Sequence, residues 1–301
     1  ECTVSGGSGT VGSADVTTVS VTCTDVAVAV TRIEGAGDSI MRGYNASCTG
    51  NTILHIFCYS GGDQNQHSFL DGSSSNVVSL LDRYRTLNAS FGGDKDASES
   101  GSEMTDPGKN NFQAQAAAIV ASTSQPSVVV VELGGNDLCN RSSDQDLYSD
   151  AQWQGAVDAG LDVLVNQLPD GSTVYLSSVP RVQDLRSVGI ALQTGNSSVN
   201  CENFWSTWGV CRIATASDSH FGALEERQQA YNAILAERAA HYNAQAGTTG
   251  VEVVAEYSGE GVASVGTYRF TPDDINGGDC FHPSIQGQNQ LSETLWRKSP
   301  R

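Results

Sequence analysis

The stretch "PSVVVVELGGNDLCN" (residues 126–140) sets a run of valines directly before two glycines and a pair of polar residues. A short, continuous apolar run bounded by turn residues is typical of a strand buried on both faces. Such strands occur in parallel sheets covered by helices, and ligands bind beyond the carboxyl ends of these strands. The stretch therefore predicts a central parallel strand, with Asn136 and Asp137 at its functional end.

Strand and helix patterns alternate along the rest of the chain. We expect strands in residues 26–35, 126–135, 172–179 and 251–257, and helices in residues 111–122, 150–168, 222–245 and 285–298. This alternation favours a parallel, doubly wound sheet with helices on both faces. Two long polar segments, 43–110 and 184–221, fit the pattern poorly, and we expect lids or binding loops there.

Residues 1–25 have a different composition, with short Val/Thr runs separated by Gly/Ser clusters. This pattern predicts a β-hairpin. It resembles the closing strands of small β-sandwich modules that precede catalytic domains in exported bacterial proteins. We therefore expect two parts, a hairpin-like remnant in residues 1–25 and an α/β domain in residues 26–301.

The overall charge of the chain limits its partners. The 301 residues carry a formal net charge of −18, with 16 scattered basic residues. Nucleic acids and anionic membrane surfaces require clustered Lys and Arg, so neither is an expected partner. No apolar stretch approaches the roughly 18–20 residues of a membrane helix. We expect a soluble protein that acts on neutral or weakly polar molecules, and the sequence leaves its oligomeric state open.

Eight cysteines are present, without a CxxC pair or a Cys/His zinc spacing. An even number of cysteines at such separations favours disulfides, and therefore a secreted or periplasmic protein whose leader has been removed. The separations favour Cys2–Cys23, Cys48–Cys58 and Cys201–Cys211, although the sequence alone does not fix the pairing.

Three candidate reactive positions follow predicted strands. Ser39, in "IEGAGDSIMRGYNAS" (33–47), is either the cap of a following helix or a nucleophile. In "DDINGGDCFHPSIQG" (273–287), Asp279 precedes His282 by three residues, a spacing at which a carboxylate can orient an imidazole. With Asn136 as an oxyanion donor, these residues supply a nucleophile, a base, an orienting group and a hydrogen-bond donor.

Three of these stretches, "GAGDSI", "LGGND" and "DCFHPSIQGQ", resemble signature blocks of the SGNH hydrolases, the GDSL esterase/lipase family. The remaining block is best matched by "SESGSEM" (98–104), which points to Gly101. Gly92 and Gly93, in "LNASFGG" (87–93), are its rivals, and the residues between that stretch and "SGSEM" look like an insertion.

The resemblance implies a three-layer α/β/α fold with a mostly parallel, flavodoxin-like sheet. It also implies Ser39 as nucleophile, His282 as general base and Asp279 as its orienting carboxylate. The oxyanion hole would consist of the backbone N–H groups of Ser39 and Gly101 and the side-chain amide of Asn136.

The implied activity is that of a serine esterase acting through an acyl-enzyme on a small-molecule or polymer-linked ester, without cofactor or metal. A polysaccharide acetylesterase and a lipase or lysophospholipase are alternatives within the family. A non-catalytic binding module on the same fold is a distant alternative. Residues 272–277, "PDDING", lack the regular alternation and the terminal Glu of a calcium loop.

The remaining two cysteines flank this expected site. Cys139 follows the GGND turn, and Cys280 lies between Asp279 and His282. We expect a Cys139–Cys280 bridge that joins the loop carrying the base to the loop carrying the oxyanion donor.

Overall fold

The computed structural model describes residues 2–5, 20–23, 30–52, 61–256 and 269–299. Its main sheet has five parallel strands in the order β4-β3-β5-β6-β7. The strands are β3 (Arg32–Gly37), β4 (Gly92–Asp96), β5 (Ser127–Glu132), β6 (Thr173–Leu176) and β7 (Glu252–Ala255). Numbered within the sheet, this is the flavodoxin-like order 2-1-3-4-5, so the predicted doubly wound sheet is confirmed.

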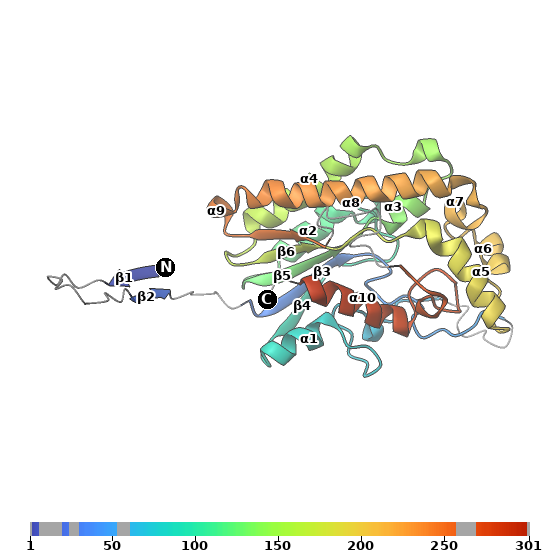
Figure 1. Ribbon diagram of the computed structural model, residues 1–301, viewed down its shortest axis with the longest axis horizontal. Helices are drawn as coiled ribbons and strands as arrows, with labels where there is room; N and C mark the ends of the chain where they lie inside the picture. Colours follow the sequence, from blue (N-terminus) through green and yellow to red (C-terminus); the bar gives the residue numbers. More distant parts are fainter. Residues whose placement is uncertain (1, 6–19, 24–29, 53–60, 257–268, 300–301) are drawn as a thin grey trace, which may run out of the picture.

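Helices cover both faces of the sheet (Figure 1). On one face lie α2 (Phe112–Val120), α4 (Asp150–Gln167) and α8 (Phe221–Asn243), and on the other lie α1 (Leu80–Leu87) and α10 (Ile285–Lys298). On the first face, Trp153 stacks on Tyr231 with ring centroids 4.1 Å apart. On the second, Tyr175 packs in one apolar cluster with Tyr84 and Leu295. The expected three-layer α/β/α architecture is confirmed.

The two central strands bring the chemically interesting segments to one edge. Every residue of β5 is buried, as its valines predict. The β3–β5 register runs from Arg32 opposite Ser127 to Gly37 opposite Glu132, so both strands end together. After β3 the chain adds β4 on one side of it and then β5 on the other side, so the order of strands switches between β3 and β5. In doubly wound sheets a crevice for a ligand opens at such a switch point. Ser39 and Asn136 follow the two strands there.

The two segments expected to be loops contain regular structure. Residues 43–110 include α1 and the edge strand β4, and residues 184–221 include α5 (Leu185–Gly195), α6 (Cys201–Trp208) and α7 (Arg212–Thr215). The interpretation of the residues before "SGSEM" as an insertion is wrong, because they form β4. Its sequence, GGDKD, has no apolar run, and backbone pairing with β3 defines it as a strand.

Smaller elements complete the described chain. The strands β1 (Cys2–Ser5) and β2 (Ser20–Cys23) pair antiparallel in a separate two-stranded sheet. Two short helices, α3 (Gly135–Cys139) and α9 (Ala246–Thr249), follow β5 and α8. Of the helices described, none has the length and apolar character needed to cross a membrane.

Candidate active site

Ser39 lies in a turn at the end of β3. Residues 39–47 form consecutive turns, so no regular helix begins at Ser39. The side chain that caps this turn belongs to Asp38, whose Oδ1 accepts the Ile40 N–H at 2.8 Å. The Ser39 hydroxyl instead lies 2.8 Å from Nε2 of His282. The geometry therefore disagrees with a cap at Ser39 and leaves its hydroxyl facing an imidazole.

Asp279 and His282 lie in the loop before α10. Nδ1 of His282 is 2.8 Å from Oδ2 of Asp279. Oδ1 of Asp279 accepts the backbone N–H groups of Phe281 and His282, each at 2.9 Å. Two buried amides also donate to this carboxylate, Asn276 at 3.0 Å and Asn45 at 2.8 Å. The carboxylate thus meets donors in every direction, which fixes it against the imidazole.

These contacts stabilise the ionised form of the Asp279 carboxyl group. Burial would raise the pKa of Asp279, but the facing His282 and the hydrogen bonds from His282 and Asn45 outweigh it and lower the pKa below its usual value. An ionised Asp279 accepts the Nδ1 proton of His282 and leaves Nε2 as an acceptor for the Ser39 hydroxyl. The rings of Tyr44 and Phe281 pack on His282, each with its centroid 4.6 Å away.

Asn136 and Asp137, in the GGND turn, form hydrogen bonds with the segment after β3 and with residues 102–105. Nδ2 of Asn136 donates to Oδ2 of Asp38 at 3.1 Å and to the Ser102 carbonyl at 2.9 Å. Asp137 accepts the Met104 N–H at 2.7 Å, the Thr105 N–H at 3.1 Å and the Thr105 hydroxyl at 2.7 Å. The turn therefore connects the end of β3 with residues 102–105.

Replacing Asp137 by asparagine is expected to flatten the dependence of stability on pH. Burial raises the pKa of Asp137 to about 7, against hydrogen bonds from Thr105 and Met104 that lower it. Because the native state holds this proton more tightly, the contribution of Asp137 to stability is greatest below about pH 4 and is lost as pH rises toward 7, by up to about 4 kcal/mol. Thermal denaturation from pH 5 to 8 tests this, with the exposed Asp146→Asn as control. An Asp137→Asn slope equal to that of the wild type would contradict it.

Hydrogen bonds on either side of Gly101 connect its turn to the segments that carry Ser39 and Asn136. The Glu99 N–H donates to the Gly37 carbonyl at 3.2 Å, and the Ser102 carbonyl accepts from Asn136. The backbone of Gly101 has φ +90°, a conformation that residues with a side chain rarely adopt. A larger residue there would strain the turn between these two contacts.

The rival glycines are at the other end of the sheet. Gly92 and Gly93 pair with Arg32 and Ile33, at the start of β3, whereas Ser39 follows the end of that strand. At about 3.3 Å per residue, the length of β3 separates them from Ser39. Neither glycine can serve as a donor near Ser39, which leaves Gly101 as the candidate.

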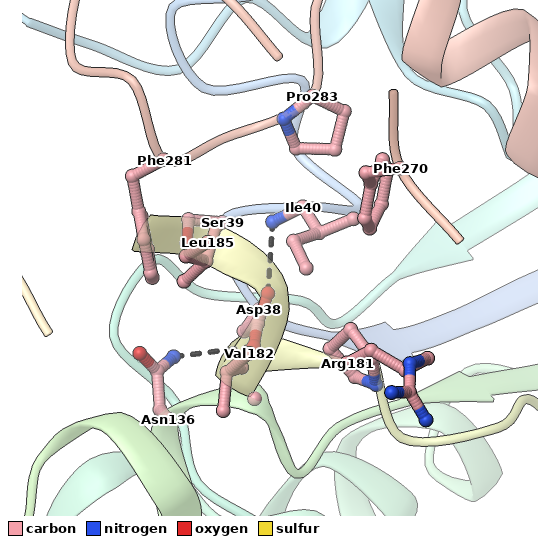
Figure 2. Close-up of a pocket in the computed structure, with 12 residues that line it drawn as sticks. Asp38, Ser39, Ile40, Asn136, Arg181, Val182, Leu185, Phe270, Phe281 and Pro283 are labelled. Carbon is pink, nitrogen blue, oxygen red and sulfur yellow. Dashed lines mark hydrogen bonds between the residues drawn. The ribbon is translucent and has the colours of Figure 1, made fainter. Parts of the chain in front are cut away.

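A small cavity of about 20 Å³ opens beside Ser39 and Asn136 (Figure 2). Its walls are largely apolar, and the side chains that form them are Ile40, Pro180, Val182, Leu185, Phe270, Phe281 and Pro283. Arg181 also borders the cavity, but its guanidinium points away from Ser39 and pairs with Asp184 and Glu225. The space next to the hydroxyl therefore suits an apolar group.

The disulfides differ from the expected pairing. Cys139 bonds Cys211 and Cys201 bonds Cys280, so the predictions Cys201–Cys211 and Cys139–Cys280 are wrong. The reason is α6, which begins at Cys201, next to the loop that carries Asp279 and His282, and leads to Cys211, next to the end of α3. Each bridge closes a long loop, with sequence separations of 72 and 79, and in the chain-entropy model contributes about 4 kcal/mol.

Two other expected bridges stay predictions. Cys58 lies outside the described residues, so Cys48–Cys58 stays a prediction. Cys2 is opposite Cys23 in the β1–β2 register, and their bond also stays a prediction. Two disulfides in the described chain are compatible with an extracellular or periplasmic protein.

Several side chains that hold the site were missed in the sequence. Asn45 and Asn276 fix Asp279, and Gln115 and Gln288 bond the turn around Ser39. In the sequence these amides look like ordinary turn or helix-surface residues. Only the burial of Gln115 and Gln288 inside otherwise amphipathic helices distinguishes them, and it depends on packing.

Comparison with known proteins identifies the family. The model of the GDSL-like lipase/acylhydrolase family matches residues 36–289, and the chain belongs to this family. The protein is thus a hydrolase of the acylhydrolase class. No curated protein sequence matches the chain.

Solved structures with a similar fold include a family 3 carbohydrate esterase from Clostridium thermocellum. It is 13% identical, with 90% of this chain and 96% of that chain covered and a TM-score of 0.43. A second is a Bacillus subtilis protein solved by X-ray crystallography, which is 15% identical, with 90% of this chain and 56% of that chain covered and a TM-score of 0.42.

Proposed function

We propose that the protein is a serine esterase that hydrolyses carboxylic esters through an acyl-enzyme, with Ser39, His282 and Asp279 as its catalytic triad. The observation that carries this proposal is the continuous line of hydrogen bonds from the Ser39 hydroxyl through both imidazole nitrogens to a buried carboxylate. A serine hydroxyl is a weak nucleophile until a neighbouring base takes its proton, and this line supplies that base.

In the first half of the reaction, Oγ of Ser39 attacks the ester carbonyl carbon while Nε2 of His282 takes the hydroxyl proton. The carbonyl electrons move onto the oxygen, which becomes an oxyanion. The tetrahedral intermediate then expels the alcohol, whose oxygen receives the proton from His282, and the acyl group remains on Ser39. Asp279 stays ionised and stabilises the imidazolium.

In the second half, His282 takes a proton from a water molecule that attacks the acyl-enzyme. Collapse of the second intermediate releases the carboxylic acid and returns the proton to Ser39. The oxyanion of both intermediates would be held by the N–H groups of Ser39 and Gly101 and by the Asn136 amide. Because both amide hydrogens of Asn136 now bond Asp38 and Ser102, one of these bonds must be exchanged or shared in the transition state.

Replacing Asn136 by alanine is expected to lower kcat by about 10²–10³, the effect of losing one oxyanion donor. The ester carbonyl is already bound before charge develops, so KM should change little. Steady-state hydrolysis of p-nitrophenyl acetate measures both constants. Asn140→Ala, an exposed amide at the end of the same short helix, is the control. Equal kcat for Asn136→Ala and Asn140→Ala would mark Asn136 as an ordinary turn residue.

The proposed substrate has an acyl group and an alcohol partner, and the surroundings of Ser39 bear on both. The apolar cavity beside Ser39 favours a small or medium acyl group. Large exposed apolar side chains in the described chain, Val78, Leu87, Trp208 and Phe221, are absent from its walls, which does not favour a lipid-binding rim. The alcohol partner is a small molecule or part of a polymer, and nucleic acid is not a partner of so acidic a chain.

A carbohydrate acetylesterase is the second candidate function, and one observation favours it. A polar groove of about 450 Å³ runs past Arg42 and residues 96–100, just before Gly101, and includes Asp63 and Asn110. Carboxylate, amide and guanidinium groups suit hydroxyl-rich ligands. Comparing acetyl, butyryl and longer p-nitrophenyl esters, and then acetylated xylan, separates this candidate from the lipase alternative.

The proposal is tested by trapping the acyl-enzyme. Rapid mixing of excess p-nitrophenyl acetate with the intact protein should give a burst of p-nitrophenol approaching one equivalent per active site when deacylation is slower than acylation. Acid quenching and peptide mapping should then find the acetyl group on the Ser39 peptide. Absence of turnover, or an acetyl group only on other residues, would overturn the proposal and favour a binding module.

The same proposal includes the organisation of the chain. We infer that residues 1–25 are the remnant of an upstream β-sandwich module, that residues 26–301 form the hydrolase domain, and that the protein is secreted or periplasmic. The separate β1–β2 sheet and the two disulfides support this inference.

A further inference from the structure

The amide side chain of Gln288 joins the two segments that carry His282 and Ser39. Gln288 lies near the start of α10 and is 0% exposed. Its Nε2 donates to the carbonyl of Ile40, the residue directly after Ser39, at 2.8 Å. Its Oε1 accepts the Phe69 N–H at 2.9 Å. Both ends of the buried amide are therefore bonded, and one of them meets the chain next to the candidate nucleophile.

The start of α10 and the loop that carries His282 pack as one unit. Ser284, two residues after His282, caps α10 by accepting the Gly287 N–H on its hydroxyl at 3.1 Å. The Ser284 N–H donates to the Asp274 carbonyl at 2.7 Å. Gly287 approaches the same carbonyl so closely that a Cβ would lie 2.2 Å from its oxygen. These contacts leave little room for Gln288 to move relative to His282.

Ile40 belongs to the same hydrogen-bonded turn as Ser39. The Tyr44 N–H donates to the Ser39 carbonyl at 3.0 Å, and the Gly43 N–H donates to the Ile40 carbonyl at 3.1 Å. The Ile40 carbonyl thus accepts from the backbone of the turn and from Gln288. Because peptide units are planar and successive units share one Cα, a displacement of this carbonyl would also displace Ser39.

A second bond joins the same two segments without a side chain. The Ile285 N–H, in the first turn of α10, donates to the Ala46 carbonyl at 3.0 Å. No substitution of Gln288 removes this backbone bond, so α10 should stay docked on residues 39–47 when the amide is lost. The expected consequence of losing the amide is a local shift at Ser39 and not unfolding.

We propose that Gln288 is a positioning residue that holds the Ser39 hydroxyl at hydrogen-bond distance from Nε2 of His282. The inference rests on the proposed esterase function. Among the hydrogen bonds of the described residues, Gln288 bonds neither group and acts through the Ile40 carbonyl. The hydroxyl and Nε2 are 2.8 Å apart, and proton transfer between them requires about 2.6–3.2 Å. A displacement of about 1 Å can cost about 10²-fold in rate, so the effect should fall on kcat.

Gln228 provides a matched control on the opposite face of the sheet. It lies in α8 and is also 0% exposed. Its Nε2 donates to the Val179 carbonyl at 2.8 Å, so it too bonds the backbone of another segment. Val179 follows β6, in a segment that contains neither Ser39 nor His282. Replacing either glutamine removes a buried amide-to-carbonyl bond, but of the two only Gln288 bonds the turn of Ser39.

The experiment measures melting temperature, and kcat and KM for p-nitrophenyl acetate, in the full chain carrying Gln288→Met or Gln228→Met. Methionine is a flexible, unbranched side chain that fills the buried space but has no amide. Gln288→Met should lower kcat about 10- to 100-fold with KM within about 3-fold. Gln228→Met should lower the melting temperature while keeping kcat within about 3-fold of the wild type.

A second measurement separates positioning from a merely structural role. In His282→Ala the base is absent, so the residual turnover no longer depends on the distance between hydroxyl and imidazole. Adding Gln288→Met to His282→Ala should therefore lower the residual kcat by less than about 3-fold. A structural effect would lower kcat by the same factor with and without the imidazole.

Gln288→Asn supplies the test if Gln288→Met does not fold, because it keeps the amide but withdraws it by one methylene. It should also lower kcat with little change in KM. Wild-type kcat in Gln288→Met or Gln288→Asn, an equal loss in Gln228→Met, or an equal loss in the His282→Ala background would overturn the role of Gln288 while the esterase function stands. A wild-type protein without turnover would overturn both.

Discussion

Replacing Ser39 by alanine is expected to lower kcat for p-nitrophenyl acetate by a factor on the order of 10⁶, the loss seen when a triad serine is removed. The alanine variant has no atom that can carry the acyl group, so the burst of p-nitrophenol should disappear as well. The variant should still fold, because Ser39 is 6% exposed and its hydroxyl bonds only His282 among the described contacts.

Ser47→Ala is the matched control, since Ser47 lies in the same run of turns but is exposed. Its kcat and its melting temperature should equal those of the wild type. Comparable hydrolysis by Ser39→Ala and Ser47→Ala, at matched thermal stability, would sink the assignment of Ser39 as nucleophile. The alternative of a non-catalytic binding module would then gain support.

Replacing Asp279 by asparagine is expected to lower kcat by about 10⁴. An amide in place of the carboxylate no longer accepts every donor that surrounds it, and it does not stabilise the imidazolium. The Nδ1 proton of His282 then loses its acceptor, so the tautomer with a free Nε2 is no longer favoured. Steady-state kinetics at saturating p-nitrophenyl acetate measure the effect.

Asp273→Asn tests whether any acid in this loop has the same effect. Asp273 is exposed and six residues away from Asp279, and its side chain has no part in the line of hydrogen bonds to Ser39. It should retain wild-type kcat. A loss below about tenfold in Asp279→Asn would show that the orientation of His282 depends on the backbone and on its neighbouring rings rather than on this carboxylate.

The sheet could be predicted from the sequence because its central strand is apolar on both faces. Val128 to Val131 are buried, and the helices that cover them are long and regular. The edge strand β4 could not, because GGDKD forms a strand through backbone pairing to β3 and not through its side chains. The missed strand also explains why Gly92 and Gly93 looked like rivals of Gly101.

The candidate residues Ser39, Asn136, Asp279 and His282 could be found in the sequence because each follows a strand pattern or a turn signal. Their supports, Asn45 and Gln115 among them, are polar residues whose importance arises only from burial. The disulfide pairing failed for a related reason. Proximity along the chain favoured Cys201–Cys211, but α6 separates those two cysteines and turns each toward a different partner.

The two disulfides connect the segments that carry the candidate catalytic residues to a segment that carries none of them. Cys280 lies between Asp279 and His282, Cys139 ends the short helix that contains Asn136, and these two cysteines are bonded to Cys201 and Cys211. The length of the segment that contains α6 therefore helps to set the distance between His282 and Asn136. If Ser39, Asp279 and His282 act as proposed, insertions or deletions there, and likewise reduction of the two bridges, are expected to change turnover without altering a reacting group.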